Sequence, residues 1–109
     1  MQRLIAFGLL FLTLNSARLK PTPELLTPTQ MVDVLTDLEL AKAMVDYYTD
    51  DEATTSQLLQ ENARLVYESY DVTPDTFQKS YQYYLGHLEV MKEIYEEVIE
   101  RLEELEEDN

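Results

Sequence analysis

The chain has 109 residues and a formal net charge of −14, with 8 Lys and Arg against 22 Asp and Glu. A nucleic-acid-binding protein needs a basic stripe that displaces counterions from phosphates, and this sequence contains none. The same charge opposes adsorption to anionic lipid. The length suits one domain, and a hydrophobic content of 45% with two glycines and four prolines favours a helical fold.

The sequence contains no cysteine. Disulfides, thiolate nucleophiles, zinc–thiolate sites and iron–sulfur clusters are therefore excluded. Because a chain without cysteine suits both oxidising and reducing compartments, the compartment has to be inferred from the N-terminal segment.

Residues 1–17 have the architecture of a secretory signal peptide. Arg3 supplies a positive start, and the apolar run over residues 4–14 is shorter than the roughly 20 residues that a membrane span requires. We therefore expect an exported protein of the periplasm or cell envelope, whose mature form has no transmembrane span. Ala17 stands where a lipoprotein signal has its lipidated cysteine, so lipid anchoring is not expected.

The segment that follows contains Pro21 and Pro23. Prolines fix the backbone angle φ and favour an extended spacer over a helix. We therefore expect an extended tether over residues 18–26 and a helical bundle domain over residues 27–109.

Residues 28–48 have the pattern of a long central helix. Thr27, Pro28 and Gln30 form a capping box with a proline at the first helical position. Apolar residues then recur every three or four positions, as on a helix that faces a core. They are Met31, Val34, Leu35, Leu38, Ala41, Val45 and Tyr48. Further apolar residues widen this stripe, which predicts contacts on two sides and an end in the polar run 49–51.

Two shorter helices are expected next. A weaker apolar pattern predicts a helix over residues 56–70. Thr73 followed by Pro74 repeats the earlier capping device and predicts a third helix over residues 74–85. Gly86 is then expected to act as a C-cap or a kink.

The last helix is predicted over residues 88–106, either separate or joined to the third as one kinked rod. Its apolar residues follow the alternating three and four spacing of a coiled-coil seam. The seam consists of Leu88, Met91, Tyr95, Val98, Leu102 and Leu105. Because it spans fewer than three heptads, packing within the domain is favoured, with a homodimer through the seam as the alternative. The expected fold is all-α, a small bundle of three to four helices.

The sequence lacks the residue patterns of known catalytic and cofactor sites. His87 is the single histidine, and no G-x-S-x-G elbow or glycine-rich loop accompanies it. Four glutamates of the last helix share one face but have no Glu-x-x-His partner, so a solvated face is favoured over a metal site. They are Glu93, Glu96, Glu97 and Glu100. We expect no catalytic residue, cofactor or metal.

Eight tyrosines are many for this length. Exposed tyrosines can form a platform for peptides or sugars. Four lie on the apolar stripes, where core packing is expected: Tyr48, Tyr81, Tyr84 and Tyr95. Of the other four, Tyr47 and Tyr83 are the candidates for an interaction surface.

Several motifs together carry a family resemblance. They are Pro23-x-x-Leu26, Met31-Val32-Asp33-Val34-Leu35-x-Asp37-Leu38-x-Leu40-Ala41, Phe77-x-x-Ser80-x-x-Tyr83-Tyr84, and Ile94-Tyr95-x-x-Val98 with Leu102. This combination, which covers nearly the whole mature chain, resembles the family of the domain of unknown function 4296, small exported bacterial proteins usually described as lipoproteins. The resemblance implies an envelope location and a helical fold. It transfers no activity, so Asp37 and Ser80 are candidate interaction positions without an assigned role.

These observations favour a non-enzymatic protein-interaction module of the bacterial cell envelope, with another envelope protein as its partner. One alternative is a periplasmic ligand- or glycan-binding protein that uses Tyr47 and Tyr83. Another is a chaperone-like helper with an acidic helical surface. A carboxylate-based enzyme is the least favoured interpretation.

Overall fold

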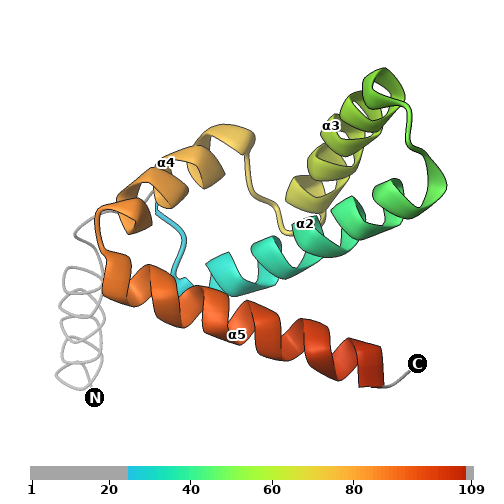
Figure 1. Cartoon of the computed structure of the whole chain (residues 1–109). Coiled ribbons are helices and arrows are strands. Elements are labelled where there is room, and N and C mark those ends of the chain that lie inside the picture. Colours follow the sequence, from blue (N-terminus) through green and yellow to red (C-terminus); the bar gives the residue numbers. More distant parts are fainter. Residues whose placement is uncertain (1–24, 108–109) are drawn as a thin grey trace, which may run out of the picture.

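The computed structural model describes residues 25–107, which form four helices (Figure 1). These are α2 (Pro28–Tyr48), α3 (Glu52–Ser69), α4 (Pro74–Leu85) and α5 (Leu88–Glu107). No strand occurs among the described residues, which confirms the predicted all-α bundle. The predicted signal peptide and most of the predicted tether, up to residue 24, lie outside the described part of the chain.

The helices begin where local capping groups satisfy backbone N–H groups that have no partner in the first turn. At α2, the Gln30 N–H donates to Thr27 Oγ1 at 3.2 Å, and the Thr27 N–H donates to Gln30 Oε1 at 2.8 Å. This confirms the capping box. At α4, the Thr76 N–H donates to Thr73 Oγ1 at 3.1 Å, as the Thr-Pro pair predicted.

The structure corrects the start of α3, which was expected at residue 56 but lies at Glu52. Asp51 is the N-cap, because its Oδ2 accepts a hydrogen bond from the Thr54 N–H at 2.9 Å. This cap initiates the helix ahead of the first apolar residues. The connection between α2 and α3 is therefore only Thr49–Asp51.

Gly86 and His87 separate α4 from α5, so the two helices are not one kinked rod. Gly86 caps α4 as expected, but its φ of −83° is right-handed rather than left-handed. A Cβ built there would lie 3.3 Å from the Tyr83 carbonyl oxygen, so close packing, not a positive φ, favours glycine. Among the described residues, a left-handed backbone conformation occurs at Asp71, which follows α3 and has a φ of 56°.

The helix α2 is the centre of the bundle. It packs against α5 on one side and against α3 on another, while α4 packs against α5. Figure 1 shows α2 and α5 running in the same general direction, with α3 and α4 forming the return path between them. The prediction that the first helix is contacted on two sides is therefore confirmed.

The core lies around the first half of α2. Its members are Leu26, Met31, Val32, Val34, Leu35, Phe77, Tyr84, Met91, Ile94 and Val98. Leu26 corrects the predicted tether, because this residue is buried in the core and does not belong to an extended spacer. All of α3 lies within the described residues, and none of its side chains is fully buried.

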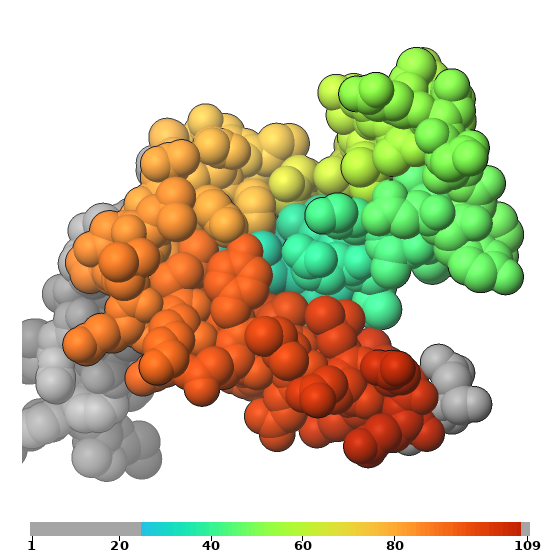
Figure 2. Space-filling view, viewed as in Figure 1, coloured from blue at the N-terminus to red at the C-terminus, as the bar shows by residue number. Residues whose placement is uncertain are grey.

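The second half of α2 is much less covered. Val45 is the one buried residue between Asp37 and Tyr48. Tyr48 was expected in the core, but 77% of its surface is exposed. Figures 1 and 2 give the reason. The α2–α3 hairpin stands away from the C-terminal end of α5, so α5 does not cover the C-terminal end of α2.

Thr36 provides a test of the core. Its Oγ1 atom is buried and has no hydrogen-bond partner among the described residues. A buried hydroxyl without a partner costs about 1–3 kcal/mol, and valine has the same shape without that cost. We expect Thr36→Val to raise the free energy of unfolding by about 1 kcal/mol, measured by urea denaturation followed by circular dichroism. A lower unfolding midpoint would show that the hydroxyl is satisfied in solution.

Candidate functional site

An apolar opening on the described part of the surface lies between α2 and α3. This α2–α3 groove has a volume of about 400 Å³. It is lined by Asp37, Leu40, Ala41, Met44, Val45 and Tyr48 of α2 and by Leu58, Asn62 and Val66 of α3. Asp37 and Asn62 supply the polar side chains, and all but one of the remaining side chains are purely hydrocarbon or thioether.

The groove follows from the amphipathic patterns of its two helices. The lining residues of α2 recur at intervals of three or four, and those of α3 at intervals of four, so each set forms one stripe along its helix. Val45 is 5% exposed and lies at the base of the groove. Met44, Tyr48 and Leu58 are 62%, 77% and 39% exposed. Three large side chains therefore present apolar surface to solvent beside a buried base.

The end of the groove nearest the core is polar. Tyr70, just after α3, donates a hydrogen bond from its hydroxyl to Asp37 Oδ2 at 2.6 Å. This hydrogen bond raises the pKa of Tyr70 to about 12, because losing the proton would leave two negative charges in contact. One turn earlier on α2, Asp33 forms an ion pair with Arg101 of α5. These two contacts join α2 to the end of α3 and to α5.

The other end of the groove carries an aromatic pair. Tyr47 and Tyr48 meet edge to face, with ring centroids 5.2 Å apart. Tyr47 is 83% exposed, as expected for a candidate surface residue. The acidic connection Thr49–Asp51 follows immediately. Aromatic side chains beside an apolar groove are typical of protein-binding surfaces.

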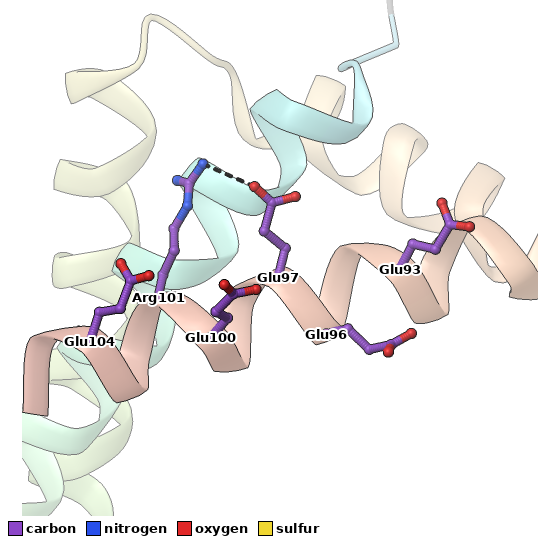
Figure 3. Close-up of a pocket in the computed structure, with 6 residues that line it drawn as sticks. All are labelled: Glu93, Glu96, Glu97, Glu100, Arg101 and Glu104. Carbon is purple, nitrogen blue, oxygen red and sulfur yellow. Dashed lines mark hydrogen bonds and ion pairs between the residues drawn. The ribbon is translucent and has the colours of Figure 1, made fainter.

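A second concave surface lies on α5 and is acidic (Figure 3). It is lined by Glu93, Glu96, Glu97, Glu100, Arg101 and Glu104. Figure 3 shows the carboxylates pointing in different directions, with Glu97 turned toward Arg101 at 3.5 Å. No group of three acidic or histidine side chains in residues 25–107 is arranged to hold a metal ion. All five glutamates are exposed, so this surface is a solvent-exposed face of α5.

The four candidate interaction residues do not form one site. Asp37 lies at one end of the α2–α3 groove and Tyr47 beside the other. Tyr83 lies near the end of α4, where its ring stacks on His87 with centroids 4.2 Å apart. Figure 1 places the ends of α2 and α4 at opposite sides of the molecule. A platform made jointly by Tyr47 and Tyr83 is therefore not formed.

Ser80 was expected on an interaction surface, and the structure corrects this because its side chain is completely buried. Its Oγ accepts a hydrogen bond from the Leu26 N–H at 2.8 Å and donates one to the Thr76 carbonyl at 2.8 Å. The Tyr84 hydroxyl donates to the Leu26 carbonyl at 2.7 Å. Ser80 and Tyr84 therefore fix the backbone of Leu26 to α4.

The seam of the last helix is used mainly inside the domain. Met91 and Val98 are buried, and Tyr95 and Leu102 pack against the core. Leu88 and Leu105, at the two ends of the seam, are 70% and 43% exposed. The exposed seam residues therefore form no continuous apolar strip. The Tyr95 hydroxyl lies 3.0 Å from that of Tyr81, and burial raises the pKa of Tyr95. The central residues of the seam therefore pack within the domain, as the favoured interpretation expected.

Sequence reasoning missed most of the α2–α3 groove. The whole apolar stripe of the first helix was expected to be covered on two sides, and the pattern over residues 56–70 predicted only a weaker helix. The breadth of the apolar stripe on α2 was the available signal, because it exceeds what one neighbouring helix can cover. The sequence could not show which part of that stripe stays open.

Ser80 is the basis of a stability prediction. In Ser80→Ala the Leu26 N–H loses its partner inside the core, which costs about 1–3 kcal/mol. We expect a reduction of that size in the free energy of unfolding. Ser56→Ala is the control, because Ser56 is exposed on α3 and its replacement should change stability by less than about 0.5 kcal/mol. Equal stabilities for the two variants would contradict the role of Ser80.

Asp37 and Tyr70 are the basis of a titration prediction. The raised pKa means that their hydrogen bond stabilises the fold below pH 10 and that this contribution is lost as the pH rises from 10 toward 12. In Asp37→Asn we expect the pKa of Tyr70 to fall toward 10, measured by NMR of the tyrosine ring carbons. Tyr47 serves as the internal control. An unchanged pKa for Tyr70 would show that the hydrogen bond to Asp37 is not what raises it.

Comparison with known proteins adds one assignment. No solved structure and no curated protein matches this chain. No helix within residues 25–107 is long and apolar enough to cross a membrane. A family model matches residues 23–108, which begins just before Leu26 and includes all four helices. The chain therefore belongs to the family of the domain of unknown function DUF4296.

Proposed function

We propose that this protein is a non-enzymatic protein-interaction module of the bacterial cell envelope, and that the α2–α3 groove binds its partner. The observation that carries this proposal is the open groove of about 400 Å³ with large apolar side chains exposed along it. Exposing such side chains together in a strongly charged chain costs solubility unless a partner covers them. A contiguous apolar groove is therefore best explained as a binding surface.

A non-enzymatic role is supported by what the candidate polar residues do. Ser80 and Tyr84 hold the Leu26 backbone, and Asp37 accepts a hydrogen bond from Tyr70. The His87 ring contacts the carbonyl oxygen of Tyr83 through Nδ1 at 2.8 Å and stacks on the Tyr83 ring. Each of these groups has a structural partner within the fold.

An envelope location is supported by the sequence of residues 1–17, which has a positive start, an apolar run and small residues, as in export signals. The helical, acidic domain would then act outside the cytoplasm. Its partner would be another envelope protein that supplies an apolar surface to the groove.

The groove can be tested by placing a photoreactive phenylalanine analogue at Leu58 in the full chain. The chain is expressed in a bacterium whose envelope contains the natural partner. We expect a covalent adduct with one defined envelope protein. The same analogue at Leu88 is the matched control, because Leu88 is equally apolar and 70% exposed but lies on α5, away from the groove. Equal adducts from both positions would refute the assignment of the groove.

A second variant makes the same test quantitative. Met44→Glu places a charge among the apolar lining residues, and burying that charge against the partner should weaken binding at least about tenfold. Leu88→Glu should leave the affinity unchanged. Circular dichroism spectra should match those of the parent chain, since both positions are exposed. If Met44→Glu binds as well as the parent chain, the groove is not the binding surface.

A further inference from the structure

We infer that the α2–α3 groove receives a cationic amphipathic helix of about three turns, an inference that rests on the proposed binding role of this groove. The occupant has apolar residues on one face and Lys or Arg near both ends. Three properties of the described residues lead to this occupant: the geometry of the lining, the incomplete packing of α3, and the charges at the two ends.

The lining has the geometry of a seat for a helix. The stripe on α2 runs from Asp37 to Tyr48, which at 1.5 Å per residue is roughly 16 Å long. The opposing stripe on α3 contains Leu58, Asn62 and Val66, one residue per turn. Two facing rows of this kind form a furrow into which a third helix packs. A length of roughly 16 Å accepts about eleven helical residues, with anchors at positions i, i+4 and i+7.

The packing of α3 indicates that a neighbour is missing. The helix has 18 residues, and none of its side chains is fully buried. Its extensive helix contact is with α2, while α4 packs instead on α5. Near the core, α2 packs on α5, and Val66 and Tyr67 of α3 pack against the core. The outer part of the hairpin stands away from α5 and is a two-helix unit (Figure 1), and two helices bury too little apolar surface to be self-sufficient. A third helix in the groove would cover Met44 and Leu58 and complete the packing.

The charges select a basic occupant. Asp37 lies at one end of the groove. Asp50, Asp51 and Glu52 follow Tyr48 at the other end. On α3, Arg64 is engaged with both Glu61 and Glu68. A helix seated in the groove therefore meets carboxylates at both ends, and basic side chains roughly three turns apart would complement them.

The same charges argue against a second copy of the chain and against an anionic membrane as occupants. Each copy carries a net charge of −14, so two copies repel one another at every distance within the Debye length. Anionic headgroups are repelled for the same reason. A cationic helix is attracted, and this attraction also accelerates the encounter.

The test uses synthetic helical peptides of about fifteen residues and the full chain. The first peptide has leucines at the three anchor positions and lysines near both ends. The second has glutamates in place of the lysines, and the third keeps the lysines but has serines in place of the leucines. We expect the first to bind at least about tenfold more tightly than either of the others, measured by fluorescence anisotropy, and more weakly as the salt concentration rises.

Variants of the protein locate the binding. Leu58→Ala should weaken binding of the leucine–lysine peptide about fivefold or more, and Asp50→Asn with Glu52→Gln should weaken it about threefold. Leu88→Ala is the matched control and should have no effect. If Leu58→Ala binds the peptide like the parent chain, the peptide merely adheres to the acidic surface, and the inference is refuted.

Other outcomes separate this inference from the proposed function. If the glutamate peptide binds as tightly as the lysine peptide while the Leu58 adduct still forms, the groove binds a partner but not a cationic one. A dimer that is lost in Met44→Glu would identify a second copy as the occupant. An adduct from Leu58 to residues 1–24, which contain Arg3, Arg18 and Lys20, would identify the chain's own N-terminal segment. Each of these results would overturn the inference.

Discussion

Helix α2 is buried along its first half and largely exposed along its second half. In its first half, Met31, Val32 and Val34 are essentially inaccessible and contribute to the core with α5, α4 and the Leu26 segment. In its second half, only Val45 is buried. One continuous helix therefore stabilises the domain at one end and exposes apolar surface at the other. Both the core and the α2–α3 groove follow from this single element.

The connection of Leu26 to α4 gives the core its second support. Ser80 and Tyr84 satisfy the N–H and the carbonyl of one residue that precedes the first helix. These contacts span 54 and 58 positions of sequence, so they close the fold from its beginning to its third helix. The family match starts at residue 23, which agrees with a domain that includes this segment.

The core and the groove proposed to bind a partner thus involve different parts of the molecule. The core residues lie around α2, α4 and α5, whereas α3 contributes no fully buried side chain. Elements with few buried contacts are the ones that can rearrange or accept a partner without unfolding the domain. The polar contacts of Asp33 and Asp37 lie between the core and the groove. Asp33 pairs with Arg101 of α5, and Asp37 accepts a hydrogen bond from Tyr70.

The four helices could be predicted from the sequence because capping and apolar spacing depend on neighbouring residues, although α3 begins at Glu52 and not at the expected residue 56. Thr27 with Gln30, and Thr73 with Pro74, specify helix starts through local hydrogen bonds and fixed backbone angles. Which apolar faces are covered depends on how the helices are arranged in space. Periodicity placed Tyr48 in the core, but it is exposed, whereas Leu26, the last residue of the predicted tether, is buried in the core. Periodicity identifies an apolar face, but the direction in which α5 diverges from α2 decides whether that face lies in the core or in an open groove.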